Sequence, residues 1–568
     1  MTASAPSPVS AAQPTFAELF TPKLVTILRE GYGLKDLRAD AIAGLTVAIV
    51  ALPLSMAIAV ASGVGPERGL YTAIVGGFLI SLLGGSRFQI GGPAGAFIVL
   101  VALIVQREGY DGLVLATLIA GVILVAIGLL RVGSFIKYIP YPVTVGFTSG
   151  IAVIIVASQV RDLAGLQLAH EPAEFLPKLK ALWDAAPTFN LATIAVSGLS
   201  LATILAVHRL RPTWPGFLIC LIGAAAATAL LHLDIATLGS RFGAMPSSLP
   251  APTLPAFTWD KFVAAIPNGL AIALLGAIES LLSAVIADGM TGRRHRSNCE
   301  LVAQGAANIG SVIFGGICAT GTIARTATNV RAGARGPISG LFHAGYLLLF
   351  MLFAAPLVAY IPLAALGAVL LVVAWKMAEK SEFIALIRGS RADALVLLST
   401  FLLTVFVDLT TGIAVGVVLG AFLFLHRMAE AVEVASGVEL ISDDKADVNG
   451  ARTAYDADQA TDPDVMVYRI SGALFFGATT AISTVLDRVG APPKSFVLDF
   501  SNVPLIDVTA ANALRGFVQK LARSGTLIYF AGARPPVRRV LKDTGFNPPA
   551  IRYAATAAEA LHQIKSNP

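Results

Sequence analysis

Long apolar runs follow one another from Asp40 to Leu425, and they constrain the fold more than any other feature. About fourteen runs of helical length can be distinguished, several of them short or merged, with Gly, Pro and charge clusters between them. A chain in lipid must satisfy its backbone hydrogen bonds internally, so such runs predict transmembrane α-helices. With 56% hydrophobic and only 13% charged residues, the chain falls outside the class of soluble globular proteins. We therefore predict a polytopic membrane domain over residues 39–430, preceded by a short segment over residues 1–38.

The basic residues predict how this domain lies in the membrane. They occur in short clusters between apolar runs and not along one face, which argues against nucleic-acid binding. If the N-terminus is cytoplasmic, the basic loops all fall on the cytoplasmic side, as the positive-inside rule requires. An even number of helices then returns the C-terminus to the cytoplasm, so both termini are expected there. The loops concerned contain Arg131, Lys137, Arg209, Arg211, Arg293, Arg331, Arg335 and the segment from Lys376 to Arg391.

Two interruptions of the apolar pattern resemble each other and indicate an internal duplication. They are "QIGGPAGAF" around Pro93 and "GGICATGTIARTATN" around Gly321. The separation of Pro93 from Ala319 along the chain equals that of Pro53 from Glu279. Each copy would have seven helices, and an odd number of crossings makes the second copy begin on the opposite side of the membrane from the first. The two copies must therefore be inverted, with their broken helices facing each other near the bilayer midplane. Irregular backbone is tolerated there only beside protein or a wet cavity, so we predict a binding site rather than mere close packing of small residues.

Glu279 is the only charged residue between Lys261 and Asp288. On a helix it would share a face with small and polar residues, so it is predicted to point toward protein or a cavity and not toward lipid. Three roles are open: binding a sodium ion with Ser283, taking up a proton as a coupling group, or pairing with a cation such as Arg325. Burial favours the neutral form of a carboxyl group, which suits proton coupling. The face in question comprises Gly269, Ala273, Gly276, Ser280, Ser283 and Ala287, with Leu274, Ile278, Leu281, Leu282 and Val285 opposite.

Arg325 follows the second interruption by a few residues and is the candidate for anion attraction. Two half-helix N-termini directed at one cavity would add positive dipole ends, and together these features suit an anionic substrate. The alternative is that Arg325 only anchors a helix end at the lipid headgroups.

The sequence offers no disulfide or metal framework. The chain has three cysteines, an odd number that cannot all pair, and their spacing does not fit a metal site; they are Cys220, Cys299 and Cys318. With no nucleophile, metal or cofactor constellation in the sequence, we predict neither an enzyme nor a cofactor.

The tail differs from the membrane half. Residues 437–464 contain eight acidic and two basic residues without an apolar run, which is typical of a linker. In residues 465–568, strand-like "VMVYRI", "SFVLDFS" and "TLIYFAGA" alternate with helix-like "ATTAISTVLDRV" and "TAANALRGFVQKLAR", which predicts a small α/β domain. Thr509 is expected to be the N-cap of the second of these helices, with a regulatory hydroxyl as the alternative.

Several segments resemble the SulP anion permeases, the bacterial branch of solute carrier family twenty-six. They are "GPERGLYTAIVGGFLISLLGGSRFQIGGPAGAF", "GAIESLLSAVIADGMTGRRHRSN" and "FGGICATGTIARTATNVRAGARGPISGLFHA". "SFVLDFSNVPLIDVTAANAL" is similar to a STAS domain, named for sulfate transporters and anti-sigma-factor antagonists. The resemblance implies a UraA-like fold of about fourteen helices in a seven-plus-seven inverted repeat with core and gate subdomains. It also implies a homodimer in the bacterial inner membrane with a cytoplasmic STAS domain, working by elevator-type alternating access.

The resemblance further implies site residues and a function. The function is secondary active transport of an anion of the sulfate, bicarbonate or dicarboxylate class, with proton symport expected. The alternatives for the transport mode are sodium symport, uncoupled exchange and an anion channel. A different class of function is a signalling scaffold in which the STAS domain is the output. Glu279 and Ser283 would couple the cation, and no other metal site is expected. Ile323, where a sodium-coupled relative would offer a hydroxyl, favours the proton. Leu54 replaces a glutamine common in the family, so the substrate does not transfer directly. Thr509 takes the place of the phosphorylated serine of anti-sigma antagonists. The anion would be bound by Ser55, Gly92, Pro93, Ala94, Gly95, Ala96, Phe97, Gly321, Thr322, Ile323 and Arg325.

Overall fold

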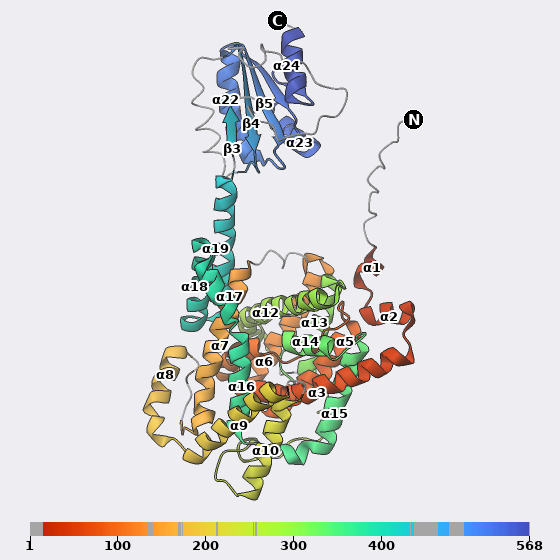
Figure 1. The fold of residues 1–568 in the computed structure, drawn as a ribbon, viewed down its shortest axis with the longest axis vertical. Helices are drawn as coiled ribbons and strands as arrows, with labels where there is room; N and C mark the ends of the chain where they lie inside the picture. Colours follow the sequence, from red (N-terminus) through yellow and green to blue (C-terminus); the bar gives the residue numbers. More distant parts are fainter. Residues whose placement is uncertain are drawn as a thin grey trace. The chain divides into compact units, whose positions relative to one another are not determined.

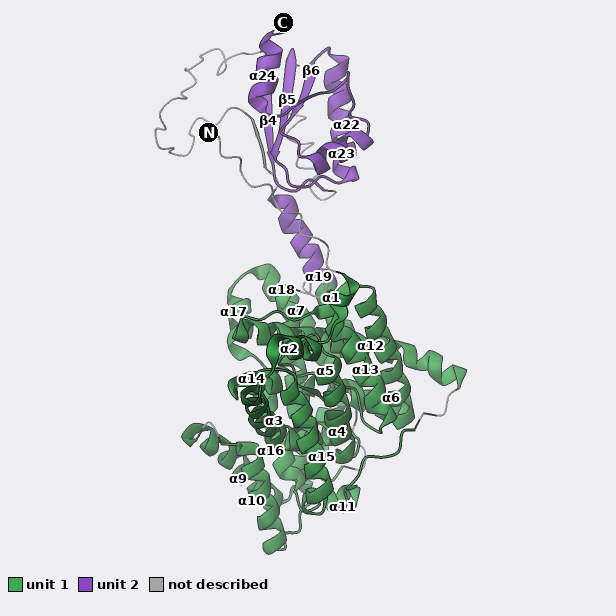
Figure 2. Cartoon of the chain, turned by 90° about the vertical axis from the view of Figure 1, so that its right-hand side faces the viewer, with its two compact units in different colours: residues 1–417 green, residues 418–568 purple. Residues whose placement is uncertain are grey.

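The chain folds into two compact units, residues 1–417 and 418–568, each of which is described by itself (Figure 2). The structure is a computed structural model that describes residues 15–133, 140–168, 172, 174–211, 214–253, 255, 258–431, 433–436, 464–475 and 493–566. Of the predicted linker only Asp464 is among these residues, and the predicted helix over "ATTAISTVLDRV" lies outside them.

The first unit is helical, and its two halves have the same order of elements. In the first half, α4 continues through the π-helical turn η1 into α5, and α6 joins two helices across Gly109, which has a φ of 72°. Each half therefore contributes seven membrane segments, as the inverted repeat predicts. The first half comprises α3 (Leu34–Ala61), α4 (Pro66–Tyr71), η1 (Thr72–Gly76), α5 (Gly77–Leu83), β1 (Gly91–Gly92), η2 (Gly95–Phe97), α6 (Ile98–Leu129), α7 (Tyr141–Ala164), α9 (Leu191–Leu210) and α10 (Gly216–Leu230). The second comprises α12 (Trp259–Thr291), α13 (Ser297–Ile313), β2 (Thr320–Gly321), α14 (Ile323–Arg331), α15 (Ile338–Val358), α16 (Leu363–Met377), α18 (Arg391–Phe406) and α19 (Leu409–Glu430), which continues beyond residue 417 into the second unit.

Only some of these segments are single long apolar helices. Seven helices in the described part of the chain have the length and hydropathy to cross a membrane. The remaining segments are shorter or broken, which is why the sequence shows several runs as short or merged.

Short helices and one 3₁₀ turn connect these segments in the described part of the first unit. They are α1 (Phe16–Phe20), α2 (Lys23–Gly31), α8 (Phe175–Asp184), η4 (Ala186–Thr188), α11 (Leu238–Phe242) and α17 (Lys380–Arg388).

The helices form two bundles, each built from both halves of the repeat (Figure 1). In one bundle α6 packs against α12 and α13, α15 packs against α3, and α14 packs against α12. In the other, α7 packs against α16 and α18, and α9 packs against α10 and α16. The first bundle carries both interruptions of the apolar pattern and corresponds to the expected core, and the second corresponds to the expected gate.

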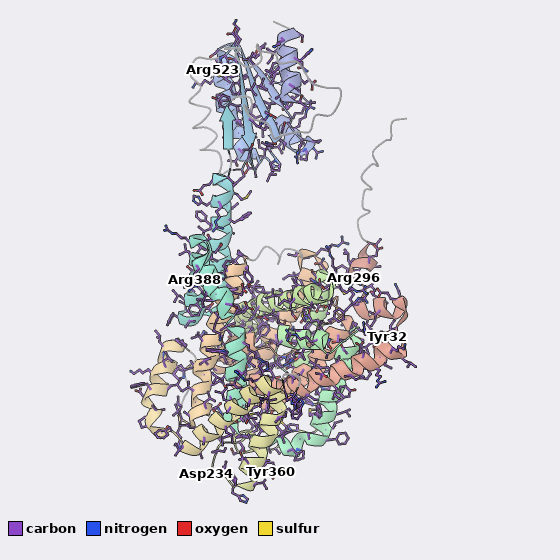
Figure 3. The ribbon with its side chains drawn as sticks, viewed as in Figure 1. Tyr32, Asp234, Arg296, Tyr360, Arg388 and Arg523 are labelled. Carbon is purple, nitrogen blue, oxygen red and sulfur yellow. The ribbon has the colours of Figure 1, made fainter. Side chains whose placement is uncertain are left out.

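Two of the predicted cytoplasmic loops lie at the same end of the first unit. Arg296, beside Arg293, and Arg388, between Lys376 and Arg391, lie at one end of the unit, and Asp234 and Tyr360 lie at the opposite end (Figure 3). The side of the membrane that each end faces stays a prediction of the positive-inside rule.

The second unit has one five-stranded sheet in the order β3-β4-β5-β6-β7. β3 pairs antiparallel with β4, and the other neighbours are parallel. Helices α22 and α23 cover one face of the sheet and α24 covers the other (Figure 2). The three predicted strands and the second predicted helix are confirmed. The elements are β3 (Glu433–Ser436), β4 (Val465–Ser471), β5 (Ser495–Asn502), β6 (Leu527–Ala531), β7 (Arg552–Ala554), α22 (Val508–Arg523), α23 (Pro535–Asp543) and α24 (Ala557–Ser566).

The predicted N-cap of α22 is wrong. Asp507 is the N-cap residue, and its Oδ1 accepts a hydrogen bond of 2.7 Å from the amide of Ala510. A carboxylate at this position is also favoured by the helix dipole, whereas Thr509 lies inside the first turn with its side chain exposed. The exposed hydroxyl leaves the regulatory alternative for Thr509 open.

Replacing this cap should destabilise the start of α22. We expect Asp507→Ala to cost about 1 kcal/mol of local stability, because the first-turn amide loses its acceptor. Hydrogen exchange of the α22 amides in the full-length protein measures the effect. Thr509→Ala is the matched control and should leave exchange nearly unchanged; equal acceleration in both variants would contradict the assignment of the cap.

Candidate functional site

The two interruptions of the apolar pattern meet at the centre of the first bundle. β1 and β2 pair antiparallel, with Gly91 opposite Gly321 and Gly92 opposite Thr320. The amide of Thr322 also donates to the carbonyl of Ile90 at 3.1 Å. This pairing joins the two halves of the chain at equivalent places, which is the contact expected of an inverted repeat.

A helix begins directly after each of these strands. η2 and α6 begin at Gly95 after the N-cap residue Ala94, and α14 begins at Ile323 after Thr322. Neither cap residue makes a side-chain capping hydrogen bond. The first-turn amides of two helices are therefore oriented toward the crossing, and helix N-termini of this kind favour anions.

Arg325 extends from α14 to the first helix of the chain. Its Nη2 donates to the hydroxyl of Ser55 at 3.1 Å and to the carbonyl of Pro93 at 3.2 Å. The side chain is 1% exposed, which rules out the alternative of a headgroup anchor. Its Nε and Nη1 have no hydrogen-bond partner in the structure. A buried guanidinium with two unpartnered nitrogens is suited to bind an anionic ligand in bidentate fashion.

Gly92 allows the guanidinium to occupy this place. A side-chain carbon at residue 92 would overlap Nη1 of Arg325, and the φ of Gly92 is 151°, which disfavours other residues. Gly321 is similarly constrained, because a side chain there would overlap the amide of Gln89. Glycine at residues 92 and 321 thus leaves room for the side chains of Arg325 and Gln89 at the crossing.

Glu279 lies on the face of α12 that packs against the crossing. One turn before it, the carbonyl of Gly276 accepts a hydrogen bond of 3.1 Å from Thr320, and one turn after it, Ser283 donates to Thr326 at 3.0 Å. The carboxyl group itself takes part in no hydrogen bond or ion pair among the described residues, so pairing with Arg325 is wrong. The side chain is 9% exposed. The small and polar residues of the predicted face are buried, and on the opposite face Leu274 and Val285 are exposed whereas Ile278 and Leu281 are buried against other helices.

The other predicted residues line the same region with different exposure. Ala94, Ala96 and Phe97 are buried, whereas Gly95, Thr322 and Ile323 are partly exposed. A carbon added at Gly95 would lie 3.6 Å from the sulfur of Met377 and 4.0 Å from Cδ1 of Ile155. Both of these residues belong to helices of the second bundle, so the site lies where the two bundles meet.

Sequence reasoning missed Gln89. It lies in the first motif, is 3% exposed, and neither polar atom of its amide has a hydrogen-bond partner in the structure. Its position two residues before Gly91 was the available signal, but the sequence does not show that the amide lies against Gly321.

Comparison with known proteins identifies the family. A model of the sulfate permease family matches residues 37–400, and a model of the STAS domain matches residues 456–560. The chain belongs to the sulfate permease family. As a member of the family it is a polytopic integral membrane protein that transports anions, and it is not an enzyme.

Relatives of this sulfate permease match over almost their whole length. The Bacillus subtilis protein YvdB is 39% identical over 91% of this chain and 95% of its own. The bicarbonate transporter BicA of Picosynechococcus is 30% identical, over 89% of this chain and 91% of its own. The sodium-independent sulfate anion transporter of Bos taurus is 28% identical, over 94% of this chain and 89% of its own.

Solved structures support the fold. The transmembrane domain of a cyanobacterial BicA covers 67% of this permease with a TM-score of 0.61 and 31% identity, and 98% of that chain is matched. The murine Slc26a9 anion transporter in the inward-facing state matches 99% of this permease and 97% of its own chain, with a TM-score of 0.83 and 17% identity. The match to Slc26a9 extends over both units, so each unit has the same fold as the corresponding part of that protein.

Proposed function

We propose that this permease is a secondary active transporter of a small anion of the sulfate, bicarbonate or dicarboxylate class. The observation that carries the proposal is Arg325, a buried guanidinium with two unpartnered nitrogens beside two helix N-termini. Positive charge from one residue and two dipoles at one point would bind an anion and would repel a cation. The names of BicA and of the bovine sulfate transporter support the first two substrate classes.

Transport would proceed by elevator-type alternating access. The site residues belong to the bundle of α3, α6, α12 and α14, and the opposing surface belongs to α7 and α16. Movement of one bundle along the other would carry the site across the membrane without breaking the β1–β2 pairing. Ile155 and Met377 of the opposing bundle, which lie near Gly95, would be among the residues past which the site moves.

Coupling to protons is assigned to Glu279. A carboxyl group without a protein partner, close to an anion site and slightly exposed, is able to accept a proton together with the anion. Protonation would neutralise a charge that is costly to move through the bilayer. Each cycle would thus move one proton and one anion in the same direction.

Sodium coupling is the second candidate. The hydroxyls of Ser283 and Thr326 lie 3.0 Å apart one turn from Glu279, and hydroxyl oxygens beside a carboxylate suit a hard cation. The hydroxyl of Thr326 already accepts from both Ser283 and the amide of Ile90, which leaves it less able to bind a metal ion. We therefore favour the proton.

The surroundings of the transporter complete the proposal. We place it in a bacterial inner membrane as a homodimer with both termini in the cytoplasm. The STAS domain would serve dimerisation or regulation, with the exposed hydroxyl of Thr509 as a phosphorylation site.

Uptake into proteoliposomes tests the function. The purified permease is reconstituted and given labelled sulfate, bicarbonate, succinate or chloride under an imposed proton or sodium gradient. We expect accumulation of one of the first three anions that depends on the proton gradient and not on sodium. Accumulation with sodium alone would favour the second candidate, and downhill flux insensitive to both gradients would indicate an uncoupled channel or exchanger.

A further inference from the structure

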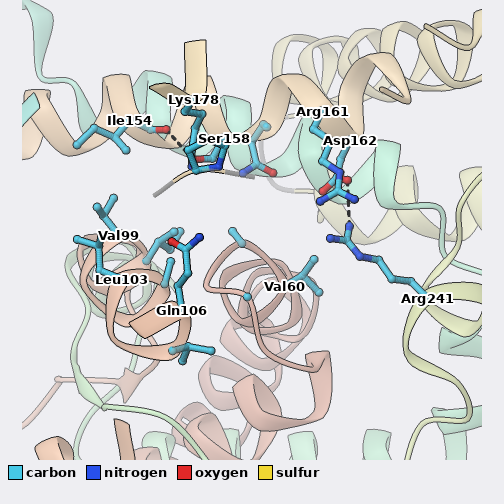
Figure 4. Close-up of a pocket in the computed structure, with 17 residues that line it drawn as sticks. Val60, Val99, Leu103, Gln106, Ile154, Ser158, Arg161, Asp162, Lys178 and Arg241 are labelled. Atoms are coloured by element: carbon cyan, nitrogen blue, oxygen red, sulfur yellow. Dashed lines mark hydrogen bonds and ion pairs between the residues drawn. The ribbon is translucent and has the colours of Figure 1, made fainter. Parts of the chain in front are cut away.

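The crossing of β1 and β2 has two differently built sides. Toward the second bundle, the start of α6 borders a cavity that Val99 and Leu103 line from one side and Ile154 of α7 from the other (Figure 4). The described lining of this cavity includes no residue of α13. On the side of α13, by contrast, residues 317–319 of the loop between α13 and β2 are at most 1% exposed. The backbone of this loop is closed off from solvent, so its polar groups need partners within the protein.

Side chains supply the hydrogen bonds of this loop. Asn308 of α13 binds both backbone groups of Ala319, since its Oδ1 accepts from the amide at 2.9 Å and its Nδ2 donates to the carbonyl at 2.8 Å. Two hydroxyls bind Ile317, whose amide donates to Thr72 of η1 at 2.7 Å and whose carbonyl accepts from Ser311 of α13 at 2.6 Å. All three of these side chains belong to residues that are at most 1% exposed. They take the place of the neighbouring strand that a larger sheet would provide.

Two further side chains hold the start of the same loop. Nη1 of Arg68 in α4 donates to the carbonyl of Gly315 at 3.0 Å, and the hydroxyl of Tyr110 in α6 donates to the carbonyl of Gly316 at 2.7 Å. A side-chain carbon at Gly316 would overlap both of the hydroxyls that bind Ile317. The loop is thus fixed to four elements of the membrane unit, α4, η1, α6 and α13.

The same helix also contacts the segment that leads into β1. Glu300 of α13 is fully buried, its Oε2 accepts from the amide of Ser86 at 3.0 Å, and its Oε1 accepts from Nε2 of Gln304 at 2.8 Å. Glu300, Gln304 and Asn308 recur every four residues, so they lie on one face of α13. One polar face therefore holds the chain in front of both strands of the crossing.

The position of Arg325 depends on this loop, because the ladder between β1 and β2 is short. Each strand comprises two residues, and so small a ladder is at best marginally stable on its own. Thr322, the N-cap residue of α14, follows Ala319 by three residues, and Arg325 lies in the first turn of α14. A displacement of the loop would therefore be carried to the guanidinium and to the N-terminus of α14.

We propose that Asn308, Ser311 and Thr72 are positioning residues of the anion site. They hold the backbone of residues 317–319 and thereby keep Arg325 and the N-terminus of α14 at the place where α6 begins. This role rests on the proposed transport function, since it is the anion that needs these groups to converge. During elevator-type movement the same hydrogen bonds would keep the site rigid within its bundle.

Hydrogen exchange in the full-length protein tests the structural part of the proposal. Asn308→Ala removes both hydrogen bonds to Ala319 and leaves buried backbone groups without partners. We expect the amides of residues 317–322 to exchange at least about tenfold faster, while the amides of α15 keep their wild-type rates.

A pair of isosteric substitutions provides a milder variant and its matched control. Thr72→Val removes the acceptor of the Ile317 amide and should accelerate exchange in the same segment. Thr117→Val makes the same change at another fully buried threonine, whose hydroxyl donates to the carbonyl of Leu113 within α6 at 2.8 Å. It should leave both the exchange of residues 317–322 and the anion affinity unchanged.

A double-mutant cycle with Arg325 tests the functional part. Sulfate, bicarbonate and succinate are titrated into the purified protein by calorimetry, with thermal stability recorded alongside. For an anion that binds the wild-type protein, we expect Asn308→Ala to weaken binding about tenfold and Thr72→Val about threefold. In an Arg325→Ala background neither substitution should weaken binding further, because both act through Arg325, whereas losses from unrelated destabilisation would add.

The outcomes separate the positioning role from the transport function. Unchanged exchange of residues 317–322 in Asn308→Ala and Thr72→Val, or faster exchange with wild-type affinity, would overturn the positioning role while uptake by the wild-type protein retains the function. A loss of affinity that adds in full to that of Arg325→Ala would also overturn it. Absence of both binding and uptake for every anion in the wild-type protein would refute the proposed function, and the positioning role with it.

Discussion

Replacing Glu279 by glutamine should abolish proton-driven accumulation while leaving anion binding intact. A pH difference of one unit is worth about 1.4 kcal/mol per proton, so one-to-one symport supports about tenfold accumulation. The amide cannot carry the proton, and the expected ratio of internal to external anion falls to about one. Because the side chain has no described hydrogen-bond partner, the isosteric amide should fold without leaving another group unsatisfied.

The measurement is uptake of the selected anion by proteoliposomes under a proton gradient, together with its Kd by calorimetry. Asp260→Asn is the matched control, since it removes an exposed acid from the first turn of the same helix and should behave as wild type. Full accumulation by Glu279→Gln would refute the coupling role. Loss of binding along with loss of accumulation would instead place the carboxyl group in the anion site itself.

Replacing Arg325 by alanine should weaken anion binding about 10- to 100-fold. The substitution removes the donors proposed to face the anion, and each hydrogen bond between charged partners contributes about 1.5–3 kcal/mol. Arg325→Lys keeps the charge but loses the planar fork, so an intermediate affinity is expected. Binding is measured by calorimetry on the purified protein, with thermal stability recorded alongside.

Two further variants make this result decisive. Gly92→Ala leaves the guanidinium in the chain but displaces it, and it should weaken binding in the same direction. Arg331→Ala removes an exposed arginine from the end of the same helix and should leave the affinity unchanged. Wild-type affinity in Arg325→Ala would assign the residue to the packing of α3 against α14 instead.

Much of the membrane unit could be predicted, because its signals are local. Hydropathy shows the spans, and the separation that relates Pro53 to Glu279 shows the duplication. The face of α12 that bears Glu279 follows from helical periodicity alone, and its burial agrees with that prediction. The break within α6 also has a local signal, since Gly109, which has a positive φ, lies among Arg107, Glu108 and Asp111 between two apolar runs.

The sequence did not identify the N-cap of α22, because two neighbouring residues can both fill that position. Asp507 and Thr509 are both good capping residues, and the choice between them depends on which backbone angles the chain adopts after β5. Pairing with Arg325 was one of three roles that the sequence left open for Glu279; it does not occur, and Arg325 instead donates to Ser55 and Pro93.

The sequence by itself determined the class of protein, the repeat and the residue types at the crossing, because these depend on composition and on periodicity along the chain. Only the tertiary structure decided which of these residues meet. Ser55 and Arg325 are joined by a hydrogen bond although they lie in different halves of the repeat, and β1 pairs with β2 across the same two halves. Such contacts depend on how helices distant in the sequence pack together, and no local pattern encodes that packing.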